Sequence, residues 1–208
     1  MASSPWPSIA YERLALAEEL ADVHGSAWEH ESLCAGWSHH VVLGHLVATA
    51  KLTPARFAVG MATSFGRFGA FSDKAARKEA RKHPSELLGE LKDLAVSQDA
   101  PPGPADSWLG EVVVHGSDIR LPLGVQHEFP VETVVRVADF YAGSNALIRS
   151  KKRIDGLTLR ATDADWSHGS GPDEVVGPLV SLVLAMTGRT GLVVDALSGR
   201  GVDVLTAR

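Results

Sequence analysis

Residues 105–119, ADSWLGEVVVHGSDI, decide how the fold is interpreted. Glu111 and His115 stand four residues apart, so at about 100° per residue they share one helical face, one turn apart. Valine and isoleucine neighbours continue the apolar side of the same segment. The pattern predicts a helix from about residue 105 to 119, stopped by the Leu-Pro-Leu-Gly run at 121–124. It places a carboxylate and an imidazole beside the stripe that should face a helical core.

A second stretch, residues 41–47 (VVLGHLV), places another histidine within an apolar stripe. His45 belongs to the core-facing side of this helix, and Gly44 beside it would let another group approach closely. Three polar groups that point into one helical core are costly unless they satisfy one another or bind something. We therefore expect His45, Glu111 and His115 to meet.

Two neutral imidazoles and one carboxylate are a common three-ligand set for a divalent ion. They suit Zn²⁺, Ni²⁺, Co²⁺ or Fe²⁺, and three protein ligands leave a position open for water or substrate. The alternative is a hydrogen-bonded core cluster without metal, because Glu-x-x-x-His pairs also arise by chance. Asp118, on the same face beyond His115, could serve as a general base, or it could orient the ligand histidine.

The hydrophobic periodicity divides the chain into a helical part and an α/β tail. Helices are expected at 8–23, 39–59 with a kink at Pro54, 84–96, 105–119 and 130–148, and the connector at 60–84 is expected to be partly helical. Beyond residue 151 we expect strands at 157–162 and around Trp166, a helix at 174–186 and an amphipathic segment at 194–205. The fold class is therefore mainly α, with a helical domain at 1–150 and a small α/β domain at 151–208.

Composition excludes several classes of protein. The 208 residues are 45% hydrophobic and 22% charged, which are ordinary globular values. A net charge of −5 gives no global reason to bind nucleic acid or an anionic membrane. No secretory signal or spanning segment is visible, so we expect a cytoplasmic protein. The basic run at 74–82 is interrupted by Glu79 and lacks aromatic residues, so it is interpreted as a solvated face.

The remaining histidines and the single cysteine are given no functional role. His39 and His40 fall in the first turn of their helix and are expected to be solvated, and His24 and His30 are expected on the surface. Because Cys34 is the single cysteine of the sequence, an intrachain disulfide framework and any cysteine-based zinc cluster are excluded. Cys34 lies in a loop and is expected to have no basic neighbour that would form a thiolate, so it is not proposed as a nucleophile.

Three segments resemble a known family. Residues 28–46, with SLCAGWSHHVVLGHL, resemble the segment that opens the second helix of DinB-like metal-dependent bundles. Residues 111–124 resemble the second-ligand segment of the actinobacterial mycothiol-dependent maleylpyruvate isomerase family. The tail, with Ala161-Thr-Asp, Trp166, Gly188-Arg189 and Leu197-Ser-Gly-Arg-Gly, is similar to the small C-terminal domain of that family. The resemblance covers nearly the whole chain.

The resemblance implies a DinB-like up-down four-helix bundle with the small domain packed on it. It implies a divalent metal, foremost Zn²⁺, held by His45, Glu111 and His115, with mycothiol as cosubstrate and a small electrophile as substrate. Binding of the thiol cofactor is assigned to Trp108 and Arg189, and catalytic roles to Arg189 and Asp118. Arg189 would meet a substrate carboxylate; alternatively, it closes a helix C-terminus.

The leading hypothesis is a mycothiol-dependent isomerase or S-transferase, with the metal generating the nucleophile. A metal-dependent hydrolase is the second enzyme hypothesis. A non-catalytic metal- or thiol-binding stress module is the third. The oligomeric state, monomer or homodimer, is left open by the sequence.

Overall fold

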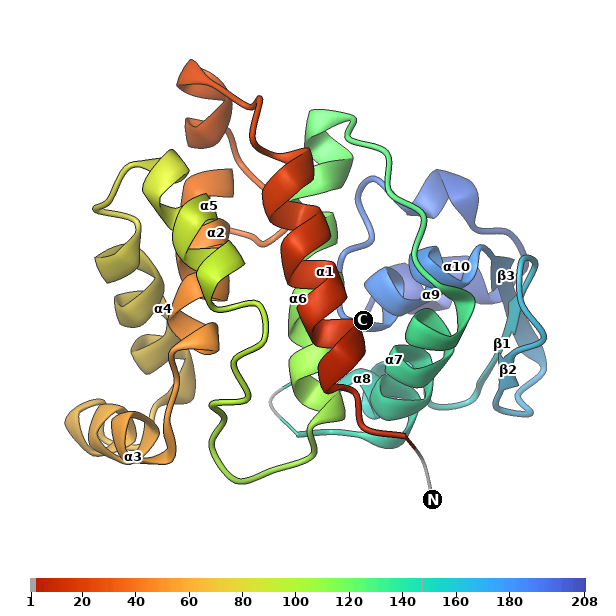
Figure 1. The fold of residues 1–208 in the computed structure, drawn as a ribbon. Coiled ribbons are helices and arrows are strands. Elements are labelled where there is room, and N and C mark those ends of the chain that lie inside the picture. Colours follow the sequence, from red (N-terminus) through yellow and green to blue (C-terminus); the bar gives the residue numbers. More distant parts are fainter. Residues whose placement is uncertain (1–2, 147) are drawn as a thin grey trace. The chain divides into compact units, whose positions relative to one another are not determined.

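The structure is a computed structural model that describes residues 3–146 and 148–208, and most of its elements are helices (Figure 1). A short 3₁₀ turn, Gly25–Glu29, follows the first helix, and another, Val194–Ala196, precedes the last. The helices and strands are, in order, α1 (Trp6–Glu19), α2 (His39–Ala50), α3 (Pro54–Thr63), α4 (Phe68–Glu79), α5 (Pro84–Asp93), α6 (Asp106–Leu123), α7 (Val131–Gly143), α8 (Ser150–Arg153), β1 (Leu157–Ala161), β2 (Ser167–His168), β3 (Asp173–Gly177), α9 (Leu179–Met186) and α10 (Gly201–Thr206).

The chain forms two compact units, Met1–Gln126 and His127–Arg208. The sequence had placed the division after residue 150. The structure places it before α7, because α7 packs against α9 and because Trp166 Nε1 donates to Asp139 Oδ1 on α7 at 2.9 Å. The fifth expected helix is therefore part of the C-terminal unit.

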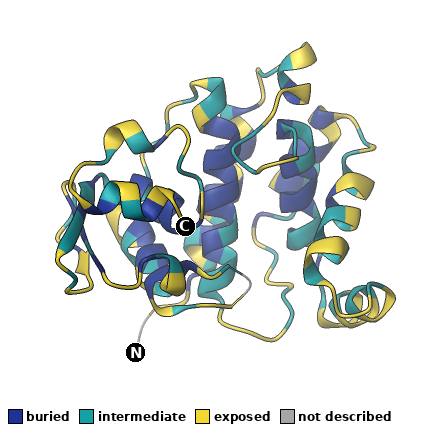
Figure 2. Ribbon diagram, turned by 180° about the vertical axis from the view of Figure 1, so that it is seen from behind, coloured by how far each residue is buried: buried dark blue, intermediate teal, exposed yellow. Residues whose placement is uncertain are grey.

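Four helices form the core of the N-terminal unit. α1 and α2 each pack against both α5 and α6, which closes a four-helix arrangement, and α4 covers α2 from outside. Figure 2 shows α2 and α6 buried along most of their length, whereas α3 and α4 carry much exposed surface. The mainly helical fold class with a small sheet, as predicted, is confirmed.

The contact between α2 and α4 depends on the absence of a side chain at Gly44. A Cβ there would lie 2.6 Å from the carbonyl oxygen of Ala76 and 2.9 Å from the amide nitrogen of Ala80. The expectation that Gly44 admits a close neighbour is met, and that neighbour is the backbone of α4.

Two helix boundaries differ from the sequence-based expectation. The helix expected at 39–59 is two helices, because Thr53 accepts a hydrogen bond from the amide of Arg56 and Pro54 starts α3. α6 continues through the expected stop to Leu123, with Pro122 inside it, and ends at Gly124 in the left-handed conformation at φ 69°.

The C-terminal unit contains a three-stranded sheet in the order β2-β1-β3. β1 pairs antiparallel with β2 and parallel with β3, and α9 packs on β1 and β3. The helix expected at 174–186 is wrong in its first turn, because residues 174–177 belong to β3. The helix starts only after Pro178, at Leu179.

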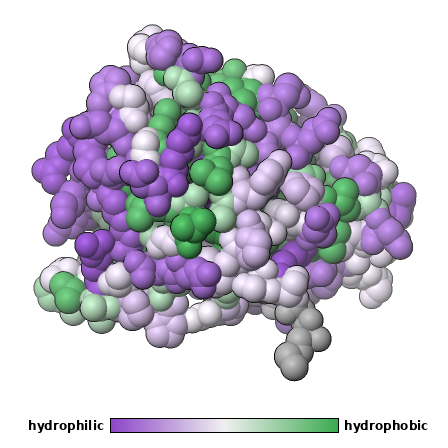
Figure 3. Space-filling view, viewed as in Figure 1, coloured by the Kyte–Doolittle hydropathy of each residue, from purple (hydrophilic) through white to green (hydrophobic). Residues whose placement is uncertain are grey.

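Over the described ranges 3–146 and 148–208, no helix combines the length and the apolar character that a bilayer crossing requires. On the face shown in Figure 3, hydrophilic side chains dominate the surface over α4 and α5, and hydrophobic atoms gather over α3. Two exposed hydrophobic residues belong to this region, Val59 and Phe65.

Candidate metal centre

Glu111 on α6 lies between two histidines of the N-terminal unit. Its Oε2 is 2.8 Å from Nε2 of His45 on α2 and 3.5 Å from Nε2 of His115, one turn further along α6. The two imidazole rings meet edge to face, with centroids 4.6 Å apart. The ligand atoms of all three residues lie within 4.8 Å of one another. The structure thus brings together the three residues that the apolar stripes singled out.

His45 is held at both ring nitrogens. Nδ1 lies 3.3 Å from Ser72 Oγ on α4, and Nε2 faces the carboxylate of Glu111. Burial disfavours the charged imidazole and lowers the pKa of His45, although the hydrogen bond with Glu111 opposes this effect. His45 is therefore neutral near pH 7, which is the form that a metal ligand requires. In the metal-free protein Nε2–H donates to Glu111 and Nδ1 accepts from Ser72. A metal ion would take the Nε2 lone pair of the other tautomer, in which Nδ1–H donates to Ser72 Oγ.

His115 is oriented by Asp118, whose side chain is fully buried. Nδ1 of His115 donates to Asp118 Oδ2 at 2.8 Å, which leaves Nε2 facing Glu111 and His45. Burial by itself would lower the pKa of His115. The hydrogen bonds of His115 with Asp118 and Cys34 outweigh that effect and, with the charge of Glu111, raise the pKa to about 9. A cation that binds here must displace this proton.

The loop between residues 31 and 38 brings an aromatic ring to the cluster. Ser32 and Trp37 close the loop, since both the amide and the hydroxyl of Ser32 donate to Trp37 O, and Gly36 turns the chain at φ 78°. The Trp37 ring centroid then lies 5.0 Å from that of His45 and 6.1 Å from that of His115. Trp37 Nε1 donates to Asp73 of α4 at 2.9 Å, which fixes the ring.

The same loop corrects the interpretation of Cys34. The amide of Leu33 donates to the carbonyl of Asp118 at 3.2 Å and holds the loop against α6. The half-buried Cys34 is thereby placed against His115, and its sulfur belongs with His115 and Asp118 to a second group of candidate ligand atoms. The expectation that Cys34 has no basic neighbour is wrong, because that neighbour is distant in sequence.

The donor set fits a divalent ion. Two imidazole nitrogens and a carboxylate oxygen converge, and their side chains are only 6%, 11% and 21% exposed for His45, His115 and Glu111. Each histidine also has a partner on its other nitrogen, Ser72 or Asp118, as metal-ligating histidines commonly do. The residues present can therefore hold a metal by three ligands, with further positions left for exogenous molecules.

Comparison with known proteins identifies the N-terminal domain and the fold of the chain. Residues 10–107 match the family model of the mycothiol maleylpyruvate isomerase N-terminal domain. Residues 10–107 form a mycothiol maleylpyruvate isomerase N-terminal domain. A crystal structure of the mycothiol-dependent maleylpyruvate isomerase superposes with a TM-score of 0.58 over 96% of this chain and 95% of that chain, at 16% identity. A histidine-to-alanine mutant of that isomerase gives a TM-score of 0.57 at the same coverage and identity. No curated protein matches the sequence.

The family assignment covers the proposed ligands unevenly. The matched residues of the isomerase N-terminal domain include His45 but stop before Glu111 and His115. The solved isomerase covers the whole region, but at 16% identity it shows the fold alone. The assignment of the three ligands therefore depends on the geometry of this chain.

The other two predicted site residues, Trp108 and Arg189, belong to different units of the chain. Trp108 is half-buried on α6, one turn before Glu111. Arg189 belongs to the C-terminal unit, where it follows α9 and donates from Nη1 to the carbonyl of Thr187 at 2.9 Å. This contact near the end of α9 agrees with the helix-closing alternative. Contact of Trp108 with a thiol and of Arg189 with a substrate stay predictions.

Two histidine expectations also change. His39 is 1% exposed rather than solvated, and its Nδ1 donates to the carbonyl of Ala27 at 2.8 Å. His40 is partly buried, and its Nε2 donates to the carbonyl of Lys82 at 2.9 Å. The two rings bind the backbone of residues 27 and 82. These contacts could not be predicted from the position of the histidines in the first turn of their helix.

Ser72, Trp37 and Cys34 are residues near the cluster that periodicity missed. Each reaches the histidines from another element, so no spacing along the chain marks it. The available signal was compositional for Trp37, since a tryptophan directly before a helix cap is a large apolar group in a short loop.

Proposed function

We propose that this chain is a metal-dependent enzyme that uses a low-molecular-weight thiol, mycothiol, as its nucleophile. It would act as an isomerase of the maleylpyruvate isomerase kind or as a thiol S-transferase, with Zn²⁺ as the leading metal and Ni²⁺ or Co²⁺ as alternatives. The convergence of His45, Glu111 and His115 within one largely buried cluster carries the proposal. The match of residues 10–107 to the isomerase N-terminal domain supports the thiol and the isomerase class.

The residues of the chain each have a part in this proposal. A divalent ion at the cluster would lower the pKa of a bound thiol, so that the sulfur is a thiolate at neutral pH. Ser72 and Asp118 direct the Nδ1 atoms of the two histidines away from the ion and keep each Nε2 available. Trp37 adds an apolar ring beside both histidines, with centroids 5.0 Å and 6.1 Å from theirs.

A hydrolase is supported less well by the same site. Such an enzyme would need a general base beside the metal, and Asp118 was the candidate. The carboxylate of Asp118 is fully buried and bonded to His115 Nδ1, which suits an orienting residue better than a base that receives a proton from water.

The first experiment is elemental analysis of the untagged protein, before and after dialysis against a chelator and after reloading with Zn²⁺. We expect about one equivalent of divalent metal per chain. The second step follows the concentration of thiol during incubation with an electrophile. An S-transferase consumes one thiol per product, whereas an isomerase changes the double-bond geometry of its substrate and returns the thiol. A chain that retains no metal after reloading would contradict the metal proposal, whatever its thiol chemistry.

A further inference from the structure

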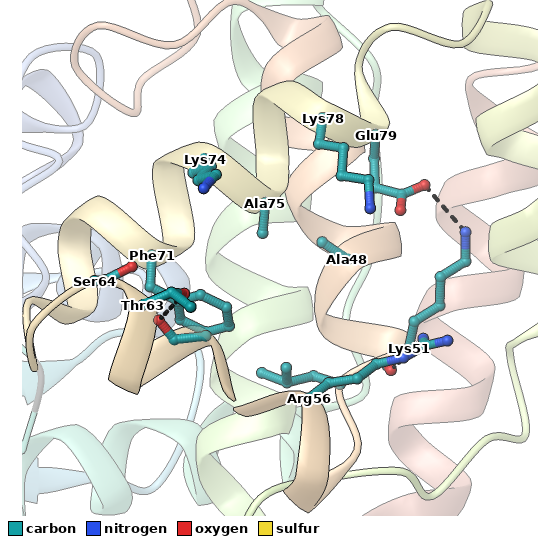
Figure 4. A pocket seen from close by; sticks show the side chains of 12 residues that line it. Ala48, Lys51, Arg56, Thr63, Ser64, Phe71, Lys74, Ala75, Lys78 and Glu79 are labelled. Carbon is teal, nitrogen blue, oxygen red and sulfur yellow. Dashed lines mark hydrogen bonds and ion pairs between the residues drawn. The ribbon is translucent and has the colours of Figure 1, made fainter. Parts of the chain in front are cut away.

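A cavity of about 510 Å³ lies in the N-terminal unit between α2, α3 and α4 (Figure 4). It contains none of the three proposed metal ligands. Its apolar lining includes Ala48 of α2, Leu52 just after α2, and Phe71 and Ala75 of α4. Gly60 on α3 allows the Phe71 ring to close one end, since a Cβ at Gly60 would lie 2.1 Å from that ring. The volume suits a small organic molecule.

The charged side chains at the cavity are unbalanced. Four cations line it, Lys51, Arg56, Lys74 and Lys78, against the single carboxylate of Glu79. Figure 4 shows Lys74 and Lys78 on α4 on one side of the cavity and Arg56 and Lys51 on the other. Lys74 and Lys78 are exposed, as predicted for the basic run of α4, and they also border this cavity.

Glu79 does not neutralise the excess positive charge at the cavity, because its carboxylate is already paired with two lysines. It pairs with Lys51 at 3.1 Å and with Lys82 at 2.7 Å, and Glu90 pairs with the same two lysines. Two lysines and two glutamates thus form a closed and neutral network.

Three cations at the cavity remain uncompensated. Arg56 donates to the carbonyl of Lys51 at 3.0 Å, and among the described residues no carboxylate lies within ion-pair distance of Arg56, Lys74 or Lys78. In a chain whose net charge is −5, three such cations beside one apolar cavity form a local reversal of charge. Cations that border an apolar lining are complementary to an anion that carries an apolar body.

We propose that this cavity is a second ligand site, which binds a small organic dianion with an apolar body. The two anionic groups would contact Arg56, Lys74 and Lys78, and the body would lie against Phe71 and the two alanines. The site shares α2 and α4 with His45 and Ser72 but uses other residues, so the proposal does not depend on the metal centre.

The test is calorimetric titration of the full chain with naphthalene-1,5-disulfonate. This probe has two anionic groups on an aromatic body, and sulfonates are poor metal ligands. We expect one site per chain. The double variant Lys74→Gln/Lys78→Gln should weaken binding by about tenfold or more, since it removes two charge-assisted contacts. Binding should also weaken as salt is raised from low to high concentration.

Two further variants distinguish the contribution of the cavity's shape to binding from that of its charge. Ala75→Phe fills the cavity without changing charge, and it should weaken binding by a comparable factor. Lys92→Gln removes an exposed lysine of α5 outside the cavity and should leave binding unchanged. Far-UV circular dichroism and the melting temperature of each variant establish that it is folded.

The outcomes separate this site from the metal centre. Equal affinity in wild type and in Glu111→Gln would show that the probe does not use the metal ligands, and so supports the proposal whether or not the metal is confirmed. No binding at millimolar probe would overturn it. The proposal would also be overturned if the double variant bound the probe as tightly as wild type does. The same holds if Lys92→Gln weakened binding as much as the double variant.

Discussion

Glu111 faces both histidines of the cluster through a single oxygen, which lies 2.8 Å from one Nε2 and 3.5 Å from the other. Glu111→Gln keeps the shape and a hydrogen-bond acceptor but removes the negative charge from the ligand set. If the cluster holds a divalent ion, metal content should fall to background after dialysis while the melting temperature of the metal-free protein changes little. Elemental analysis and thermal unfolding on the same samples measure both.

The matched control is Cys34→Ser, because Cys34 belongs with His115 and Asp118 to an overlapping group of candidate ligand atoms. This variant should keep its metal if Glu111 is the third ligand. Loss of metal from Cys34→Ser together with retention by Glu111→Gln would assign the ion to the other group.

The raised pKa of His115 predicts how metal affinity depends on pH. In the metal-free protein His115 carries a proton up to a pKa of about 9, and a metal ion must displace it. Affinity should therefore rise by about one log unit per pH unit from pH 7 and level off near pH 9. Metal titrations at several pH values test this, and Asp118→Asn should move the plateau to lower pH. An affinity that is constant between pH 7 and 9 would contradict the assignment.

The raised pKa of His115 also makes the stability of the metal-free chain depend on pH. Stability should fall as pH rises, whereas metal affinity should increase. The pKa of His115 is higher in the folded protein than the ordinary value of 6.5. Its contribution to stability is thus complete below about pH 6.5 and is lost as pH rises through about 9. Metal-free and metal-loaded protein should differ most in melting temperature at the alkaline end.

At this scale the sequence predicted which ligand residues meet but not what surrounds them. His45 and the Glu111/His115 pair were recognisable because each interrupts an apolar stripe with helical spacing. Ser72 and Cys34 approach from other elements, and their positions depend on the packing of α4 and on a loop closed by backbone hydrogen bonds. Neither determinant has a periodic signature in one sequence.

At the scale of elements, the contact of α2 with α4 supports the histidine side of the cluster and can be tested by a pair of glycines. Gly44→Ala would put a Cβ 2.6 Å from the Ala76 carbonyl, and backbone must shift to admit it. We expect a loss of about 1–3 kcal/mol of stability. Gly89→Ala, on the exposed side of α5 with nothing within 4 Å, should instead stabilise by about 0.5–1 kcal/mol.

Thermal unfolding of the two variants under identical conditions measures the difference. Because α4 also carries Ser72, Gly44→Ala should weaken metal binding as well, whereas Gly89→Ala should not. If both variants are stabilised, the described approach of the two helices is wrong.

Element boundaries were predicted less well than element types, for physical reasons. Residues 173–177 combine two valines with a following apolar helix, and a short apolar run has no period that separates strand from helix. Pairing with β1, which lies outside that window, determines the strand. The break at Pro54 was visible in the sequence, but the choice between a kink and two capped helices depended on the Thr53 side chain.

At the scale of the whole molecule, the two units separate metal binding from the predicted substrate contact. All three proposed ligands belong to the N-terminal unit, and Arg189 belongs to the C-terminal unit. Arg189→Ala should therefore leave metal content unchanged and lower the thiol-dependent turnover by about tenfold or more, as for a lost contact with a substrate carboxylate. Metal analysis and initial rates on one preparation measure both.

Arg200→Ala is the control, because Arg200 is a highly exposed arginine of the same unit. It should match wild type in both measurements. Equal turnover in the two variants would leave Arg189 with only its contact to the carbonyl of Thr187 near the end of α9.

The position of Trp37 allows metal binding at the cluster to be followed by tryptophan fluorescence. Its indole ring lies 5.0 Å from the ring of His45 and 6.1 Å from that of His115, and its Nε1 is fixed on Asp73. An imidazolium at such range quenches indole emission by accepting an electron from the excited ring. Loss of the His115 proton, whether by alkali or by a closed-shell ion such as Zn²⁺, would therefore brighten Trp37. With the other four tryptophans replaced by phenylalanine, the fluorescence of this one side chain would report the occupancy of the centre in real time.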